Sequence, residues 1–465
     1  MFPHQDPNLP VEERLDDLLL RMTTEEKIMQ TDQYFSGDFT TQDENGKVVA
    51  MDMQRYAEHG NSVGSVQLRG MTAAQANTVQ RYAVENTRLG IPFLFSEEAL
   101  HGLFTNNATS FPQQIGLAAT FEPALGREMG HAIASEARAC GIHETYSPVM
   151  DLIRDPRYGR TEESYGEDTH LCAEFARETV RGMQGQDLKN PDTVAAEPKH
   201  YVGYGNPVGG LNCAPSTMGR HDVFSDCLPV FEAAFVDGKA CDAMCSYNSI
   251  DSIPVSMDHE ILTDVLRDRY GMPGFVRSDM TAVSRLYDWH FIAETPEEAI
   301  RLGLEAGVDL QLYDFPHDVW QNAIACLIEE GKMKMSVLDT ACRRVLLVDD
   351  VALNLKVLEA MLKKLDISAA CAGSGEEALR LLRDTPRFDA VLTDLWMPGM
   401  NGFELARRIA ESADWRSIPV VAVTADTQVL AGKAGVFRDI LLKPITRESL
   451  HKMFEHILTG REMSR

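Results

Sequence analysis

The chain has 465 residues, of which 44% are hydrophobic and 25% charged, and its formal net charge is −26. This length exceeds one ordinary domain, and the composition is that of a soluble globular protein rather than a disordered one. The negative charge argues against nucleic acid or an anionic membrane as a partner.

The start of the chain and its cysteines favour a cytoplasmic location. The first residues lack a basic segment followed by an apolar core, so we expect no secretory signal. No apolar run is long enough to span a bilayer. The nine cysteines are scattered without a CxxC pair, and Cys241 and Cys245 have no second Cys or His pair at metal-binding spacing. We therefore expect reduced thiols.

The first part of the chain alternates helical and strand-like stretches. An amphipathic helix is expected from Val11 to Met22, and Thr23-Thr24-Glu25-Glu26 supplies a capping box for the next helix. Further helical stretches run from Phe121 to Cys140 and from Pro296 to Ala306, with apolar strand-like runs between them. This alternation predicts a parallel sheet, closed as a (β/α)8 TIM-type barrel.

Several of these strand-like runs end in reactive side chains. The run Gly274–Ser278 ends at Asp279. In a parallel barrel the strand ends face one another around one rim, so a polar residue there indicates catalysis. The alternative is that Asp279 caps the next helix. The other rim candidates are Glu98, Arg160, Lys199, His200 and Tyr247.

Such a pocket suits a small saccharide. Glycoside cleavage needs a carboxylate beside an oxocarbenium-like centre and a proton donor for the leaving oxygen, and the adjacent Lys199 and His200 are placed to bind two hydroxyls. Two alternatives remain open. His200 could be a structural histidine, and Glu98 could be a first-turn helix acid.

Segments spread over residues ~10–345, a barrel-sized stretch, resemble the N-terminal barrel of family 3 glycoside hydrolases. They are Met22–Lys27, Glu98–Gly102, Asp155–Arg160 with Tyr165–Asp168, Lys199–Tyr201, Met244–Asn248 and Gly274–Asp279. The resemblance implies that Asp279 is the nucleophile of a retaining mechanism and that the barrel needs no cofactor. It also implies that Glu98, Arg160, Lys199, His200 and Tyr247 line the subsite for the non-reducing sugar.

Two departures from that family concern the sugar and the acid/base. Many members carry the shorter Asp where this chain has Glu98, so we expect β-xylosides beside β-glucosides as substrates. In two-domain members the acid/base is a Glu of a following sandwich domain, whereas a different domain follows here. In single-domain members a histidine serves where this chain has Tyr204. The acid/base is therefore unknown, with Glu162 and Glu163 the first candidates.

The motifs change near residue 343. An apolar strand ending in Asp349 and Asp350 begins a compact doubly wound, flavodoxin-like pattern with an amphipathic helix from Asn354 to Leu365. Further strands are expected at Ala390–Asp394 and Val420–Thr424, and Ile440–Pro444 closes the series. Acids at neighbouring strand ends form a hard-oxygen cluster suited to Mg²⁺, although they could instead cap helices.

Residues ~343–460, about one small domain, resemble response-regulator receiver domains. The matching segments are Leu347–Asp350, Leu392–Gly402, Val423–Ala425 and Lys443–Pro444. The resemblance implies that Asp394 is the phosphoacceptor and that Asp349, Asp350 and Asp394 hold Mg²⁺. Thr424 is then the switch hydroxyl, and Lys443 pairs with the phosphoryl group. Ile440 replaces the usual Tyr or Phe, and Asn354 is typical of the terminal receivers of hybrid histidine kinases.

We therefore expect two domains, a glycosidase barrel at 1–343 and a receiver at 344–465. The predicted function is a retaining β-glycosidase, exo-acting on non-reducing-end sugars, tied to a phosphorelay whose partner is a histidine kinase or phosphotransfer protein. Two alternatives stay open: a signalling protein whose impaired barrel only senses sugar, and a fused or truncated gene product.

Overall fold

The computed structural model consists of two compact units, Met1–Thr340 and Ala341–Arg465. The residues described are 2–42, 48–52, 63–105, 108–334, 337, 344–363, 367–384, 388–412, 415–416, 418–424, 436–446, 449–450 and 453. The expected boundary touches Arg343, which lies outside the described residues, as do Leu365 and Ala425. The boundary at 343 and 344 thus stays a prediction.

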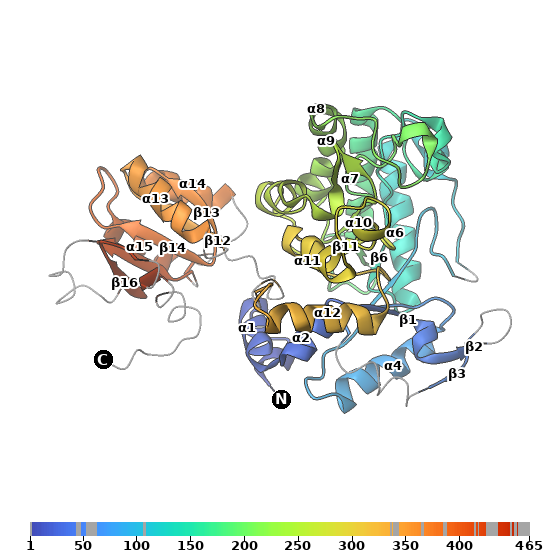
Figure 1. Ribbon diagram of the computed structural model, residues 1–465, viewed down its shortest axis with the longest axis horizontal. Coiled ribbons are helices and arrows are strands. Elements are labelled where there is room, and N and C mark those ends of the chain that lie inside the picture. Colours follow the sequence, from blue (N-terminus) through green and yellow to red (C-terminus); the bar gives the residue numbers. More distant parts are fainter. Residues whose placement is uncertain are drawn as a thin grey trace. The chain divides into compact units, whose positions relative to one another are not determined.

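The first unit, coloured from blue to orange-yellow in Figure 1, is a closed parallel barrel by its strand pairing. One sheet has the order β1-β4-β5-β6-β7, and β8 pairs with β11. Parallel bridges join Tyr201 to Cys245, Arg277 to Leu310 and Asp32 to Gln311, which closes the ring back to β1. The strands are β1 Gln33–Phe35, β4 Ser65–Gln67, β5 Leu94–Glu97, β6 Glu144–Thr145, β7 Ala195–Ala196, β8 Ala243–Cys245 and β11 Val276–Ser278.

Helices cover the outside of this ring and follow the sequence pattern closely. They are α1 Val11–Arg21, α2 Thr24–Gln30, α4 Ala73–Asn86, α5 Gln114–Ala118, α6 Pro123–Ala139, α7 Thr169–Gln184, α8 Arg220–Asp222, α9 Leu228–Glu232, α10 Arg285–Asp288, α11 Pro296–Ala306 and α12 His317–Glu329. At the start of α2 the Thr23 hydroxyl accepts the Glu26 N–H, and the Glu26 carboxylate accepts the Thr23 N–H. The expected capping box is therefore present.

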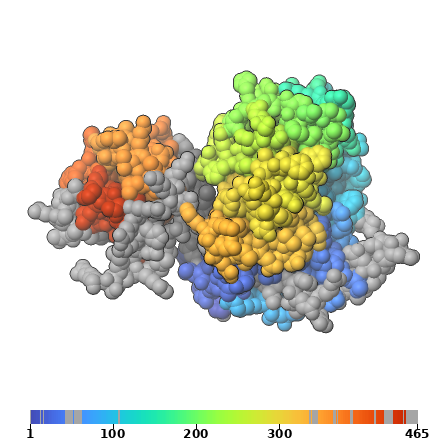
Figure 2. All heavy atoms as spheres, in the orientation of Figure 1, coloured from blue at the N-terminus to red at the C-terminus, as the bar shows by residue number. Residues whose placement is uncertain are grey.

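The described residues of the first unit also include three π-helical stretches and two small antiparallel strand pairs. The π-helical stretches are Val223–Cys227, Ala233–Asp237 and Glu260–Arg269. The strand pairs are β2 Thr40–Gln42 with β3 Val48–Met51, and β9 Ser249–Ile250 with β10 Ile253–Pro254. In the space-filling view, the yellow segment around α10 and α11 abuts the green segment of α8 and α9, so the chain following β11 lies at the surface (Figure 2).

The interior of the barrel contains a buried charge cluster. Arg277 on β11 is fully buried, and its Nε lies 2.9 Å from Glu197 Oε2. Its second guanidinium nitrogen contacts Glu144 on β6. Because all strands of a parallel barrel point the same way, this filled interior leaves the carboxyl ends of the strands as the place for a site.

The second unit is a doubly wound parallel sheet of order β13-β12-β14-β15-β16. Its strands are β12 Arg344–Val348, β13 Ser368–Ala372, β14 Ala390–Asp394, β15 Val420–Thr424 and β16 Asp439–Leu442, and its helices are α13 Ala352–Lys363, α14 Gly375–Asp384 and α15 Gly402–Glu411. Leu346 and Val348 pack on one face of β12, and Val345 and Leu347 on the other. This alternation reflects a central strand buried on both sides. Both predicted fold classes are confirmed.

No helix in the described ranges is both long and apolar enough to cross a membrane.

Candidate functional site

Asp279 lies at the carboxyl end of β11, as the sequence predicted. Its N–H donates to the carbonyl of Cys245 at 3.1 Å, and Oδ1 accepts the Met280 N–H at 2.8 Å. The residue is only 8% exposed, and Oδ2 accepts no hydrogen bond from any described residue. Helix α10 begins at Arg285 with Ser284 as its N-cap, so Asp279 does not cap that helix. One carboxylate oxygen is thus held in place and the other is free.

His200 lies beside this free oxygen. Its Nε2 is 3.4 Å from Asp279 Oδ2 and 3.1 Å from a guanidinium nitrogen of Arg160, and its Nδ1 is 2.7 Å from Asp151 Oδ2. A guanidinium can only donate, so Nε2 is the acceptor and the proton lies on Nδ1. Burial, followed by the charge of Arg160, lowers the pKa of His200 well below its usual value. His200 is therefore neutral.

Arg160 is itself held by Glu163. The Arg160 Nε lies 2.9 Å from Glu163 Oε1, and a second nitrogen lies 2.8 Å from Oε2. Burial would lower the pKa of Arg160, but the hydrogen bonds and charge of Glu163 raise it above its usual range. Both oxygens of Glu163 are occupied by this pairing, and Glu162 lies in the same short turn, Thr161–Glu163.

Lys199 and Glu98 form the second ion pair of the site. The Lys199 Nζ lies 2.7 Å from Glu98 Oε2 and 5.9 Å from the centre of the Tyr146 ring. The Lys199 side chain is buried, whereas that of Glu98 is 29% exposed. Glu98 is in irregular chain after β5, so it is not a first-turn helix acid. The pair places one cation and one carboxylate together at the rim, as binding of sugar hydroxyls requires.

Aromatic side chains complete the site. Tyr204 meets His200 edge-on at 4.9 Å between ring centres and lies 5.4 Å from Tyr247. Burial, and then the charge of Asp279, raise the pKa of Tyr247 above its usual range. The Tyr204 hydroxyl donates to Asn212. The structure thus brings the five other predicted barrel residues together with Asp279.

Three further residues of the site were missed from the sequence. Asp151 ends a strand-like run, which is the signal used for Asp279. Asp314 accepts the N–H groups of Val283 at 2.5 Å and Ser284 at 3.2 Å, which holds the chain after Asp279 in place. Arg285 lies 5.4 Å from the Tyr247 ring centre, a contact for which the sequence offers no signal.

Burial raises the pKa of both Asp151 and Asp314 to about 7. Asp151, Glu163, Glu98 and Asp314 all accept hydrogen bonds from neighbouring groups. Among these carboxylates and Asp279, the free Oδ2 of Asp279 is the atom best placed to attack a bound molecule.

In the second unit, Lys443 joins two of the predicted acids. Its Nζ lies 2.5 Å from Asp394 Oδ2 and 3.2 Å from Asp349 Oδ2. Burial would lower the pKa of Lys443, but the hydrogen bond and charge of Asp394 raise it. The Asn354 amide donates to both oxygens of Asp349 at 3.0 Å, and Thr424 is buried at the end of β15. Lys443, Asp394 and Asp349 therefore meet at the carboxyl end of the sheet, where Thr424 ends β15.

The carboxylates at this end of the sheet suit Mg²⁺, which prefers carboxylate oxygens as ligands. Asp349 and Asp394 already converge on a cation, the Lys443 ammonium, and Asp350 is exposed beside them. Within the described residues no three acidic, histidine or cysteine side chains stand at metal-ligand spacing. The metal role of Asp349, Asp350 and Asp394 thus stays a prediction.

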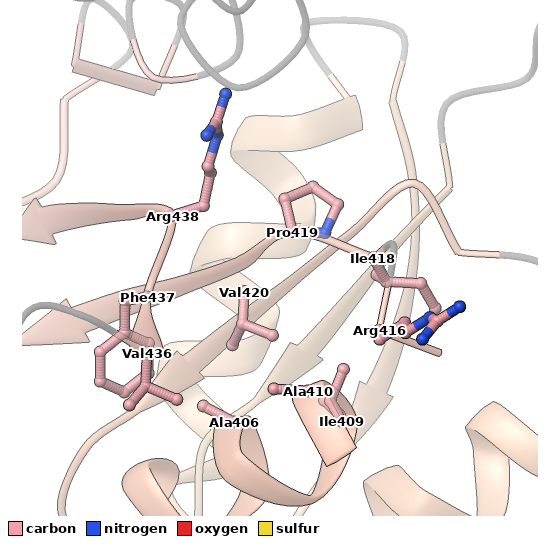
Figure 3. A pocket seen from close by; sticks show the side chains of 10 residues that line it. All are labelled: Ala406, Ile409, Ala410, Arg416, Ile418, Pro419, Val420, Val436, Phe437 and Arg438. Atoms are coloured by element: carbon pink, nitrogen blue, oxygen red, sulfur yellow. The ribbon is translucent and has the colours of Figure 1, made fainter. Parts of the chain in front are cut away.

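A cavity of about 520 Å³ lies at the opposite end of the same sheet (Figure 3). Apolar side chains of α15 and of the starts of β15 and β16 form its floor, and Arg416 and Arg438 lie at its edge. None of the predicted phosphoryl-binding residues lines it.

Fold and site together define a parallel barrel with a carboxylate-centred site, followed by a doubly wound domain whose acidic side chains are bridged by a lysine. The chain belongs to glycosyl hydrolase family 3, because residues 23–348 match the N-terminal domain of that family. Residues 345–455 match the response regulator receiver domain. Both resemblances read from the sequence are confirmed.

Similar proteins include sugar-cleaving enzymes. A β-xylosidase of Formosa agariphila is 36% identical over 306 residues, covering 63% of this chain and 42% of the relative. A periplasmic β-glucosidase of Salmonella typhimurium is 33% identical over 330 residues, covering 71% of this chain and 41% of the relative. The chain thus spans less than half the length of these curated relatives.

Solved structures agree on the fold. A β-glucosidase of Erythrobacter marinus aligns with a TM-score of 0.65 at 23% identity, covering 98% of this chain and 77% of that one. A β-glucosidase of Listeria innocua aligns with a TM-score of 0.63 at 25% identity, covering 88% of this chain and 69% of that one.

Proposed function

We propose that the barrel is a retaining, exo-acting β-glycosidase for β-xylosides and β-glucosides, with Asp279 as its nucleophile. The observation that carries this proposal is the buried, unbonded Oδ2 of Asp279, which lies beside His200. The β-xylosidase and β-glucosidase among the relatives support it. Lys199, Glu98, Arg160, His200 and Tyr247 bind the non-reducing sugar.

In the proposed reaction, Oδ2 of Asp279 attacks the anomeric carbon. The bond from oxygen to carbon forms while the bond from that carbon to the leaving oxygen breaks, and the leaving oxygen takes the electron pair. Water then attacks the same carbon, the bond from that carbon to Asp279 Oδ2 breaks with its electron pair returning to Asp279, and the proton of the water passes to solvent. We assign no general acid, because the pocket carboxylates Glu98, Asp151 and Glu163 are all hydrogen-bonded to cations or to His200.

The test compares leaving groups. Dinitrophenyl glycosides need no proton and should form a covalent adduct at Asp279, detected by mass spectrometry. Alkyl glycosides should react up to ~10²–10⁴-fold more slowly, the usual worth of general acid catalysis. Asp279→Asn should form no adduct. If even dinitrophenyl β-xyloside and β-glucoside leave the protein unlabelled, the barrel is not a glycosidase.

A second candidate is a sugar-sensing barrel within a signalling protein. It is favoured by the hydrogen bonds of Glu163, because both of its carboxylate oxygens accept from Arg160 and neither is free to carry a proton to a leaving group. Such a barrel would bind xylose or glucose in calorimetry while forming no adduct. Adduct formation at Asp279 decides for the enzyme.

We propose that the second unit accepts a phosphoryl group at Asp394 from a histidine kinase or phosphotransfer protein, in the cytoplasm. Support comes from Lys443, whose ammonium bridges Asp394 and Asp349 and would neutralise phosphoryl oxygens. Asp349, Asp350 and Asp394 would hold Mg²⁺, which when bound offsets the negative charge of the donor. A small phosphodonor with Mg²⁺ should label the protein, and Asp394→Asn should not be labelled. Equal labelling of both would refute the assignment.

A further inference from the structure

Asp151 is the buried carboxyl of the pocket for which the proposed reaction has no role. It lies beside Lys199, to which the same stretch of chain is bridged through Val149. Its Oδ2 accepts from His200 Nδ1 at 2.7 Å, and its Oδ1 faces the backbone N–H of the same histidine at 3.4 Å. Both oxygens of Asp151 are therefore directed at one residue.

The contacts of His200 leave one arrangement of protons. Arg160 donates to Nε2, so the single ring proton of a neutral imidazole lies on Nδ1 and is donated to Asp151. Placed on Nε2, the same proton would oppose the Arg160 N–H and would bring a positively polarised hydrogen near Asp279 Oδ2, which lies 3.4 Å from that nitrogen. Such a charge would stabilise the carboxylate and lower its reactivity.

We infer that Asp151 is a positioning residue of the barrel: its carboxylate keeps the His200 proton on Nδ1 and so keeps Oδ2 of Asp279 free to attack. The inference rests on the proposed role of Asp279 as nucleophile. It assigns to Asp151 an action through His200, since Asp151 has no contact with the reacting carbon.

Asp151→Asn is the matched perturbation. The side-chain oxygen of the asparagine stays opposite the backbone N–H of His200, and its amide NH2 group therefore faces the ring nitrogen Nδ1. Nδ1 must then accept, and the ring proton moves to Nε2. A hydrogen bond to a charged group corresponds to a factor of roughly 10–150 in equilibrium, and adduct formation at Asp279 should slow by up to that factor. Affinity for free xylose or glucose should change by less than about threefold, because the sugar's ion-paired partners Lys199 and Glu98 remain.

The first measurement is independent of activity. Nitrogen-15 NMR of the full-length protein with labelled histidine, at pH 8, distinguishes the two neutral tautomers, and His200→Gln assigns the signal. We expect the Nδ1–H form in the parent and the Nε2–H form in Asp151→Asn. An Nε2–H signal in the parent, or an unchanged tautomer in the variant, would overturn the inference.

The second measurement is the rate of adduct formation with dinitrophenyl glycoside. Asp242→Asn is the control, because it makes the same change at another buried carboxyl, one that bonds the Phe275 N–H instead. Asp242→Asn should react at the parental rate and Asp151→Asn should not. Equal slowing in both variants would reduce Asp151 to a structural role. If the parent forms no adduct, the proposed function fails, while the tautomer measurement still decides the role of Asp151.

Discussion

Replacing Arg277 by Met should destabilise the barrel in a strongly pH-dependent way. Arg277 is fully buried with Glu197 at 2.9 Å and Glu144 in contact, and its guanidinium carbon lies 4.7 Å from the Tyr146 ring centre. Burial raises the pKa of Glu144 and of nearby Asp242 to about 7. The cluster thus holds one cation, Arg277, among three carboxyl groups. Carboxyl groups whose negative charge Arg277 does not neutralise keep their protons.

Without Arg277, one more carboxyl must take up a proton on folding. The pKa of Glu144 is already above its unfolded value of 4.5, and losing Arg277 raises it further. The folded state then binds more protons than the unfolded state, so stability falls as pH rises above about 4.5. Relative to the parent, the loss should grow by about 1.4 kcal/mol per pH unit above about pH 7, because there Glu144 loses its proton in the parent and keeps it in the variant. At pH 8 it should reach the 3–5 kcal/mol typical of a broken buried ion pair.

Urea unfolding at pH 5 and pH 8 measures this difference. The fluorescence of Trp320, buried in the barrel, reports the transition in a Trp396→Phe, Trp415→Phe background that silences the second unit. Adding Glu144→Gln and Glu197→Gln to Arg277→Met should remove the pH dependence that Arg277→Met adds, because these amides need no proton. An equal loss of stability at both pH values would show that packing, and not charge, explains the cost.

Three further predictions concern the two sites. Glu98→Asp should raise the ratio of kcat/KM for β-glucosides over β-xylosides by about 10-fold or more, because one methylene in a binding site changes selectivity by about 10–200-fold. An unchanged ratio in steady-state assays would show that Glu98 does not select the sugar. Lys443→Met should slow phosphorylation of Asp394 by roughly 10–150-fold through the lost charged hydrogen bond, and labelling at the parental rate would contradict this. Phosphorylation at Asp394 should change sugar affinity in calorimetry by less than about twofold, because Ile440 replaces the aromatic switch residue. A change within the usual 5–150-fold range would instead reveal allosteric coupling.

Local patterns were enough to place much of this molecule. The capping box at Thr23, the helix at Pro296–Ala306 and the sheet positions of Asp279 and Asp394 follow from periodicity, turn residues and polar strand ends. Each of these signals lies within a few residues of the chain and is therefore visible in the sequence alone. The same holds for the alternation along β12, where neighbouring side chains must face opposite sides of the sheet.

Partners distant in the sequence needed the folded chain. Nothing local indicates that Asp151 binds His200, that Arg277 joins Glu144 to Glu197, or that Asp32 bridges to Gln311 and closes the barrel. Sequence periodicity indicates which face of a strand is buried, but it does not indicate which strands are its neighbours in the sheet. The ring position of the His200 proton, and with it the free oxygen of Asp279, depends on Asp151, His200 and Asp279 meeting at one rim of the barrel. Only packing of the whole barrel brings these three residues together.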